Sequence, residues 1–376
     1  MRKDSGQGAK ASGPGGDVEA DGHGSTDSGP YQFQENKMKY RYLGKTGLLV
    51  SRLSLGTLTL GADDWGCDAK TSVKIIHRFL DAGGNFIDSA DIYSKGISEE
   101  VVGKALKGRK RDDVVLGSKC LFRMGEGPND KGLGRKHILS ACENSLRRLQ
   151  TDYIDIYTMH GPDPFTPLEE TMRTLDDLVR QGKVRYIGCS NFWGWQVLKA
   201  NGISDRMNLE RFACGQYPYN LLDRTFEHEL LPAFEDQGMG FNCWSPLAGG
   251  LLTGKYRGSA RPKKGTRIYK RVNIDGSRFW SDRTLSVTEE ILKIADDCGL
   301  NPLQLALSWL LHDRRVSAVI FGVTSLPQLE EILVSGDLEL EEEIWRKVKE
   351  VSEPEPDALI KQDLMAKKTT FGEEEF

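Results

Sequence analysis

Short apolar runs rich in Val, Ile, Leu and Phe alternate with longer amphipathic runs along most of this chain of 376 residues. The apolar runs have the length of β-strands, and the amphipathic runs have the spacing of α-helices. This alternation predicts parallel strands joined by right-handed crossover helices. We expect eight strands, at residues 52–55, 86–88, 114–119, 153–160, 184–190, 212–217, 240–244 and 318–321. Eight such repeats favour an α/β fold of the closed (β/α)8 type, a TIM barrel.

The runs between these strands predict the helices. We expect them at residues 68–82, 99–106, 135–149, 168–181, 194–200, 227–237, 287–297, 302–312 and 327–333, with one more ending near residue 351. Residues 40–43 and 48–50 flank Gly44-Lys45-Thr46-Gly47, which predicts an N-terminal β-hairpin before the barrel. A doubly wound sheet is the competing fold, but it needs a glycine-rich turn after the first strand. Residues 55–61 read LGTLTLG and lack that spacing.

The two ends of the chain differ from its middle in composition. Residues 1–37 contain almost no aliphatic side chains, so they cannot bury enough apolar surface to fold, and we expect disorder. Residues 6–11, GQGAKA, imitate a dinucleotide-binding fingerprint, but they follow no strand and we reject that interpretation. The barrel domain is therefore expected at residues 38–352, followed by a polar C-terminal tail at residues 353–376.

Charge and cysteine content argue against several classes of protein. A net charge of −4 gives no overall field that attracts nucleic acid or an anionic membrane. Seven scattered Cys residues without a Cys-x-x-Cys pair indicate reduced thiols in a cytoplasmic protein. The sequence shows no His or Cys cluster with metal-ligand spacing, no apolar stretch that could span a bilayer and no signal peptide. We expect no metal, no nucleic-acid partner and no membrane partner.

Four residues that could carry chemistry follow successive predicted strands. Asp88, Tyr93, Lys119 and His160 would meet at the C-terminal rim of a barrel, where active sites lie. A phenol beside an ammonium group is a better proton donor, and a carboxylate would hold that ammonium charged. A histidine could direct a carbonyl oxygen toward the phenol, so the set suits acid-catalysed carbonyl reduction. Taken singly, the carboxylate could cap a helix, the tyrosine or lysine could face solvent, and the histidine could be a buried structural residue.

A flat cofactor ring could also bind at this rim. Trp244 offers a stacking platform for a nicotinamide, although it could instead be a core aromatic. Ser190, Asn191 and Gln216 offer donors and acceptors that a carboxamide can pair with.

Residues 88–93, 135–149, 162–190 and 244–256 resemble the aldo-keto reductase family. They are most similar to the branch that contains voltage-gated potassium-channel β subunits and their bacterial reductase relatives. By this resemblance, Tyr93 is the proton donor, Lys119 and Asp88 tune it, and His160 orients the substrate carbonyl. The channel subunits carry Asn at the His160 position, which moves the interpretation toward the reductases.

The same resemblance implies NADP as cofactor, with NAD possible. It implies a cofactor site made of Gly56, Thr57, Asp88, Ser190, Asn191, Gln216, Trp244, Ser245, Pro246, Leu247, Gly249, Lys255, Arg267, Gly322, Thr324, Gln328 and Glu331. The chain departs from its relatives at the adenosine end. Ser325 stands where NADP-selective members often carry a cation, and Ile332 replaces an amide. A 2′-phosphate usually recruits Arg or Lys, so we expect weak selectivity for NADP over NAD.

Two functions follow from these patterns. The first is an NAD(P)H-dependent reductase of an aldehyde or ketone, whose substrate would be selected by residues 62–66, 162–164 and 263–283. The last of these segments carries Tyr269, Phe279 and Trp280, which would suit a sugar or a ring-bearing ketone. The second is a nucleotide-loaded redox sensor of the channel β type with slow turnover. The sequence does not predict an oligomeric state.

Overall fold

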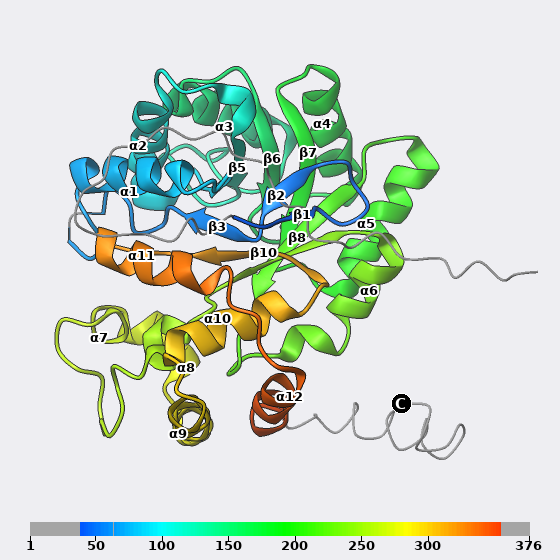
Figure 1. Ribbon diagram of the computed structural model, residues 1–376. Helices are drawn as coiled ribbons and strands as arrows, with labels where there is room; N and C mark the ends of the chain where they lie inside the picture. Colours follow the sequence, from blue (N-terminus) through cyan, green and yellow to red (C-terminus); the bar gives the residue numbers. More distant parts are fainter. Residues whose placement is uncertain (1–37, 63, 355–376) are drawn as a thin grey trace, which may run out of the picture.

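The computed structural model describes residues 38–62 and 64–354, so the predictions for residues 1–37 and nearly all of the C-terminal tail lie outside it. Eight parallel strands close into a barrel in the order β10-β3-β4-β5-β6-β7-β8-β9 (Figure 1). Their bounds are β3 Leu53–Gly56, β4 Phe86–Asp88, β5 Val115–Cys120, β6 Ile154–Met159, β7 Val184–Ser190, β8 Phe212–Pro218, β9 Gly240–Trp244 and β10 Val316–Phe321. The TIM barrel expected from the sequence is confirmed.

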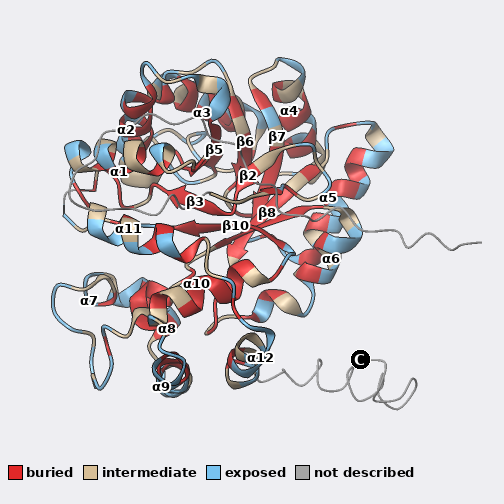
Figure 2. Cartoon of the chain, in the orientation of Figure 1, coloured by how far each residue is buried: buried red, intermediate tan, exposed pale blue. Residues whose placement is uncertain are grey.

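Helices follow the strands and cover the outside of the barrel. Their bounds are α1 Ala69–Asp81, α2 Ile97–Leu106, α3 Arg135–Leu149, α4 Leu168–Arg180, α5 Gly194–Met207, α6 Leu230–Gln237, α9 Asp282–Asp297, α10 Pro302–His312, α11 Leu326–Ser335 and α12 Glu342–Val351. Short helical turns lie at η1 Tyr93–Gly96, η2 Arg111–Asp113, η3 Thr225–Glu227, η4 Ala248–Thr253, α7 Arg267–Lys270, η5 Val272–Gly276 and α8 Ser277–Phe279. Strands and inner helix faces are buried, and outer helix faces are exposed (Figure 2).

Two helices, α5 and α9, extend well beyond their expected bounds, by more than a helical turn. α5 continues past Asn201-Gly202, a pair that disfavours helix, because Asn201 is buried and its Oδ1 accepts a hydrogen bond from Phe212 N on β8. α9 begins at Asp282 instead of residue 287, because Ser281 caps it by accepting from Thr284 N. Tertiary contact and capping decided these boundaries rather than periodicity.

The expected hairpin closes one end of the barrel. β1 (Tyr40–Tyr42) and β2 (Leu49–Ser51) pair antiparallel, and Leu43 and Val50 pack against Phe86 inside the barrel. The turn approaches β9 so closely that a Cβ on Gly44, which has φ +57°, would lie 2.3 Å from Gly240 N. With this end plugged by apolar side chains, polar chemistry is left to the opposite end, where the strands terminate.

Strand register brings the polar strand ends together. Asp88 pairs with Gly117, Lys119 with Thr158, and Gln216 with both Ser190 and Asn242. Paired residues of parallel strands point to the same side of the sheet, so these side chains share one end of the barrel. Among the described residues, the longest apolar helices still fall short of what a membrane span requires.

Candidate active site

Lys119 joins the acidic and phenolic groups at the barrel rim. Its fully buried ammonium donates hydrogen bonds to Asp88 Oδ2 at 2.7 Å, Ser89 O at 2.7 Å and Tyr93 OH at 3.2 Å. An ammonium group has three protons to donate, and here each has an acceptor. The strand order therefore places three of the four expected catalytic residues in direct contact.

The backbone after β4 fixes where Tyr93 points. Ser94, Lys95 and Gly96 all adopt left-handed conformations, with φ of 47°, 53° and 94°, which is unusual for residues other than glycine. At Gly96 a side chain would collide with Arg148, since a Cβ there would lie 2.7 Å from Arg148 Cδ. This turn starts α2 immediately after the tyrosine, and it leaves Tyr93 half-buried above Lys119.

Burial and neighbouring charges have opposing effects on the pKa values of Tyr93 and Lys119. Burial raises the pKa of the Tyr93 phenol, and the positive charges of Lys119 and Arg267 offset part of that rise. Burial alone would lower the pKa of Lys119, but the charges of Asp88 and Tyr93 and their hydrogen bonds outweigh it, so the Lys119 pKa is raised. Lys119 is therefore an ammonium group, and Tyr93 keeps its proton until negative charge develops nearby.

His160 lies beside Tyr93 immediately after β6. The two rings meet edge to face with centroids 5.8 Å apart, and His160 N donates to Cys120 O. Its Nδ1 is buried and has no hydrogen-bond partner among the described residues. Burial, followed by the positive charge of Lys119, lowers the pKa of His160 to about 3. The imidazole is neutral at physiological pH and has one N–H to donate.

A chain of hydrogen-bonded side chains connects Asp88 to the residues expected to bind a carboxamide. Gln216 Nε2 donates to Asp88 Oδ1 at 2.8 Å, and Ser190 Oγ donates to Gln216 O at 2.7 Å. Asn191, with φ of 59°, donates from Nδ2 to Ser190 Oγ and to His160 O, each at 2.9 Å. The amide group of Asn191 is exposed while Ser190 and Gln216 are buried. The three residues thus form a connected polar edge beside the catalytic set.

The segment after β9 fits a diphosphate. Ser245, Ala248, Gly249 and Gly250 have left-handed φ of 57°, 46°, 66° and 96°, and Pro246 and Leu247 lie between them. Such backbone turns direct N–H groups toward an anion. The ammonium of Lys255 lies against this loop, because a Cβ on Gly250 would sit 2.3 Å from its Nζ.

The cations beside this loop repel each other. Although Lys255 as a whole is exposed, surrounding protein atoms and the positive charge of Arg267 lower the pKa of its ammonium. Arg267 also donates to Asp275 at 2.8 Å, which Arg271 shares at 3.1 Å. A bound anion would relieve the repulsion between Lys255 and Arg267, so these residues fit the phosphates of a dinucleotide.

The expected adenosine residues lie at the start of α11. Gln328 Oε1 accepts from Thr324 N at 2.8 Å, and Glu331 Oε1 accepts from Asn301 Nδ2 at 3.0 Å. Gly322, Gln328 and Glu331 are exposed. By contrast, Ile332 is packed into the hydrophobic core, so its side chain faces away from that surface.

Two expected cofactor residues follow β3. Gly56 ends the strand, and a Cβ there would lie 2.9 Å from Ile320 Cγ2. Thr57 is fully buried, and its hydroxyl donates to Ser89 Oγ at 2.9 Å. Gly56 therefore packs against β10, whereas Thr57 contacts the segment between β4 and Tyr93 and supports it.

Of the aromatic residues expected to select the substrate, some lie at the surface and one lies in the core. Tyr269 is exposed and Trp280 is half-buried against Tyr256, with ring centroids 5.5 Å apart. Phe279 belongs to the core, because α8 turns it inward, so its ring does not face solvent.

Sequence reasoning missed Phe122, whose ring centroid lies 5.0 Å from that of His160. It follows Cys120, the last residue of β5, by two positions, and an aromatic just past a catalytic strand was the available signal. Phe165, Trp193 and Trp195, which lie after β6 and β7, are also exposed. In the described part of the chain, no three His, Cys, Asp or Glu side chains are grouped as metal ligands.

Comparison with known proteins places this fold and site in a family. The family model described as Aldo/keto reductase family matches residues 52–353, so the chain belongs to the aldo/keto reductase family. It is 38% identical over 325 residues to a Bacillus subtilis protein named Uncharacterized oxidoreductase YrpG, covering 84% of this chain and 96% of that protein. It is 38% identical over 305 residues to a probable voltage-gated potassium channel subunit beta of Arabidopsis thaliana, covering 80% and 92%. It is 33% identical over 357 residues to Aldo-keto reductase AMT2 of Alternaria alternata, covering 86% and 94%.

These relatives confirm the resemblance inferred from the motifs, including its channel-subunit branch. Family membership supports an oxidoreductase that uses a nicotinamide cofactor and a small carbonyl compound.

Proposed function

We propose that this protein reduces an aldehyde or ketone to an alcohol with Tyr93 as the proton donor. The observation that carries the proposal is the contact of one buried ammonium, Lys119, with both Asp88 and the Tyr93 hydroxyl. A bound reduced nicotinamide would supply the hydride to the carbonyl carbon. The protein must then deliver a proton to the carbonyl oxygen.

The residues divide that task. Tyr93 transfers its hydroxyl proton to the oxygen as the carbon accepts the hydride, and its own oxygen becomes negative. Lys119 stabilises that charge through its 3.2 Å contact, and Asp88 keeps the ammonium in place. Neutral His160 donates its N–H to the carbonyl oxygen and so orients it toward Tyr93. Oxyanion stabilisation by preorganised donors is usually a large part of catalysis.

The fit of the loop after β9 to a diphosphate supports a nicotinamide dinucleotide, and we expect NADPH as the cofactor with NADH as an alternative bound at most about tenfold more weakly. Trp244 would stack on the nicotinamide, with Ser190, Asn191 and Gln216 at its carboxamide. Lys255 and Arg267 would bind the diphosphate, and Thr324, Gln328 and Glu331 would bind the adenosine end. The same chemistry is available to both cofactors, except at the 2′-phosphate.

The substrate side of the site is apolar. Phe122, which is 45% exposed, lies on the loop after β5, and its ring centroid is 5.0 Å from that of His160. Phe165, which is 92% exposed, lies on the loop after β6, in the segment that follows His160. Trp193 and Trp195 follow β7 and are exposed. Aromatic walls favour a carbonyl carried on a flat or apolar group.

Following the absorbance of NADPH while a series of aldehydes and ketones is added one at a time tests this function directly. Consumption that requires both a carbonyl compound and intact Tyr93 supports it, and no consumption with any member of an aliphatic, aromatic and sugar series rejects it. A regulatory subunit of the channel β type is not favoured, because the catalytic set is complete with His160. A cytoplasmic location remains a prediction.

A further inference from the structure

A cation lies over the proposed nicotinamide platform. Arg278, on α8, places its guanidinium carbon 4.5 Å from the centre of the Trp244 ring. Arg278 Nη2 also donates to Asp223 Oδ2 at 2.9 Å. Both side chains are partly buried, with 33% and 18% of their surfaces exposed. The platform residue therefore carries a charged pair that none of the expected cofactor contacts includes.

The pair is held by a rigid loop after β8. Asn220 and Asp223 exchange backbone hydrogen bonds of 3.1 and 3.0 Å. Asn220 is fully buried, and its Nδ2 donates to Ser245 O at 3.0 Å. The loop is therefore hydrogen-bonded to Ser245, the residue that follows Trp244. This fixes Asp223 relative to the platform.

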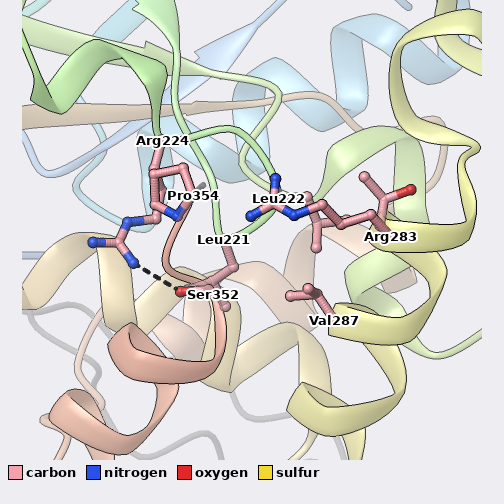
Figure 3. A pocket seen from close by; sticks show the side chains of 8 residues that line it. Leu221, Leu222, Arg224, Arg283, Val287, Ser352 and Pro354 are labelled. Carbon is pink, nitrogen blue, oxygen red and sulfur yellow. Dashed lines mark hydrogen bonds between the residues drawn. The ribbon is translucent and has the colours of Figure 1, made fainter. Parts of the chain in front are cut away.

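The far end of the same loop is anchored as well. Buried Arg224 donates to Lys349 O at 2.6 Å and to Ser352 Oγ at 3.1 Å, at the end of α12. Figure 3 shows Arg224 pointing to Ser352, beside a hollow lined by Leu221 and Val287. Because the loop is anchored at both ends, the position of Asp223 is set by the fold, and the ion pair with Asp223 holds Arg278 near Trp244.

We propose that the Arg278–Asp223 pair sets how strongly the site discriminates between reduced and oxidised nicotinamide cofactor. The inference rests on the proposed function, because it takes Trp244 as the nicotinamide platform. A reduced nicotinamide ring is uncharged, whereas an oxidised ring carries a positive charge. A guanidinium close to the platform disfavours the charged ring by like-charge repulsion. Asp223 cancels part of that repulsion.

The two charges have opposite effects, and this gives a sharp test. Arg278→Gln removes the cation and leaves the anion, so it tightens binding of the oxidised cofactor relative to the reduced one. Asp223→Asn keeps an oxygen that accepts from Arg278 but removes the anion, so it weakens binding of the oxidised form. For one partly screened charge we expect shifts of about threefold to tenfold in the affinity ratio, in opposite directions.

The measurement is isothermal titration calorimetry on nucleotide-free full-length protein. NADP+ and NADPH are titrated separately, with NAD+ and NADH in parallel, and the ratio of oxidised to reduced Kd is compared between variants. Arg278→Lys keeps the charge and should remain within about twofold of wild type. Arg283→Gln is the matched control, because it also removes one cation, but its Nη2 contacts Glu353 O rather than Trp244.

The possible outcomes distinguish a failure of the redox discrimination from a failure of the proposed reductase function. A wild-type protein that binds none of the four dinucleotides rejects the proposed function. Wild-type binding with an unchanged ratio in both variants overturns the redox discrimination alone. A shift of both ratios in the same direction also overturns it, because loss of a structural contact would act on both variants alike.

Discussion

His160 and Phe122 meet edge to face, with ring centroids 5.0 Å apart and ring planes at 71°. The ring of Tyr93 also contacts His160 edge to face, with centroids 5.8 Å apart. Phe122 is 45% exposed, and we expect its exposed surface to contact an approaching substrate. The neutral hydrogen-bond donor and the apolar wall of the proposed substrate site are therefore one packed unit.

Phe122→Ala should raise KM for an aromatic aldehyde more than for a short aliphatic one, because the lost ring contacts the substrate's flat group. Aromatic pairs contribute about 0.5–1.5 kcal/mol beyond their buried area, which corresponds to roughly threefold to tenfold. Steady-state kinetics with both aldehydes measures the difference. Tyr42→Ala is the control, since Tyr42 is an aromatic 41% exposed on β1, in the hairpin at the opposite end of the barrel. Equal changes for the two aldehydes would remove Phe122 from the substrate site.

Tyr93→Phe should keep cofactor binding and lose most turnover. The hydroxyl is the proposed proton donor, and general-acid catalysis contributes about 10²–10⁴ in rate. The ring would still pack on His160, so stability should change little. Cofactor Kd and kcat are measured on the same preparation. Carbonyl reduction near the wild-type rate would show that another group supplies the proton.

His160 should not contribute a titration to the pH–rate profile between pH 5 and 9. Burial and Lys119 lower its pKa to about 3, so the ring is neutral throughout that range. His160→Asn keeps a donor on a smaller side chain, and it should lower kcat/KM more than it weakens cofactor binding. A wild-type limb with an apparent pKa near 6 that disappears in His160→Asn would contradict the neutral imidazole.

Asp91 is a buried carboxyl that sequence reasoning passed over. It lies between Asp88 and Tyr93, and neither carboxyl oxygen has a hydrogen-bond partner among the described residues. Burial first, and then the negative charge of Glu99, raise its pKa to about 7, against the opposing charges of Arg148 and Lys119. Ionising Asp91 is therefore unfavourable in the folded protein but not in the unfolded chain, so ionisation lowers the free energy of unfolding.

The sign of the pH dependence follows from the raised pKa. Stability from protonated Asp91 is fully present below its unfolded pKa and is lost as the pH rises through about 7. Asp91→Asn should therefore gain stability relative to wild type as the pH rises from 5 to 8, by roughly 2–3 kcal/mol, because about two pKa units of the shift act over that interval at 1.36 kcal/mol per unit. Urea unfolding at both pH values measures it, with exposed Asp152→Asn as control. A constant difference across that range would show that Asp91 does not titrate there.

The barrel was predictable because its signal is repeated and local. Each strand reads as an apolar run, and α3 and α10 begin and end where periodicity put them. Polar residues at strand ends also indicated Asp88, Lys119 and His160, since the geometry of a parallel barrel brings strand ends together. These positions required no knowledge of side-chain contacts.

The remaining features depend on contacts that periodicity does not encode. The insertion at α7, η5 and α8 is ordered by pairs such as Arg271 over the Trp65 ring, at 4.8 Å, between segments far apart in sequence. The Asp223–Arg278 pair spans 55 residues. Ile332 shows the same limit, because the sequence indicated only that it replaces an amide, whereas the structure shows that its side chain packs into the core.

Cofactor choice should depend on Ser325. This residue precedes α11, where a helix N-terminus can attract phosphate, but a hydroxyl supplies no positive charge for a 2′-phosphate. Ile332 is buried, so it neither adds nor removes a contact there. We expect NADPH to bind at most about tenfold tighter than NADH, or about 1.4 kcal/mol. Ser325→Arg should add a charge-assisted contact of roughly 1.5–3 kcal/mol and tighten NADPH selectively. Fluorescence titration of both cofactors measures the preference, with Ser325→Gln as the uncharged control. A wild-type preference of about a thousandfold, or roughly 4 kcal/mol, would mean that a cation from another segment reads the phosphate.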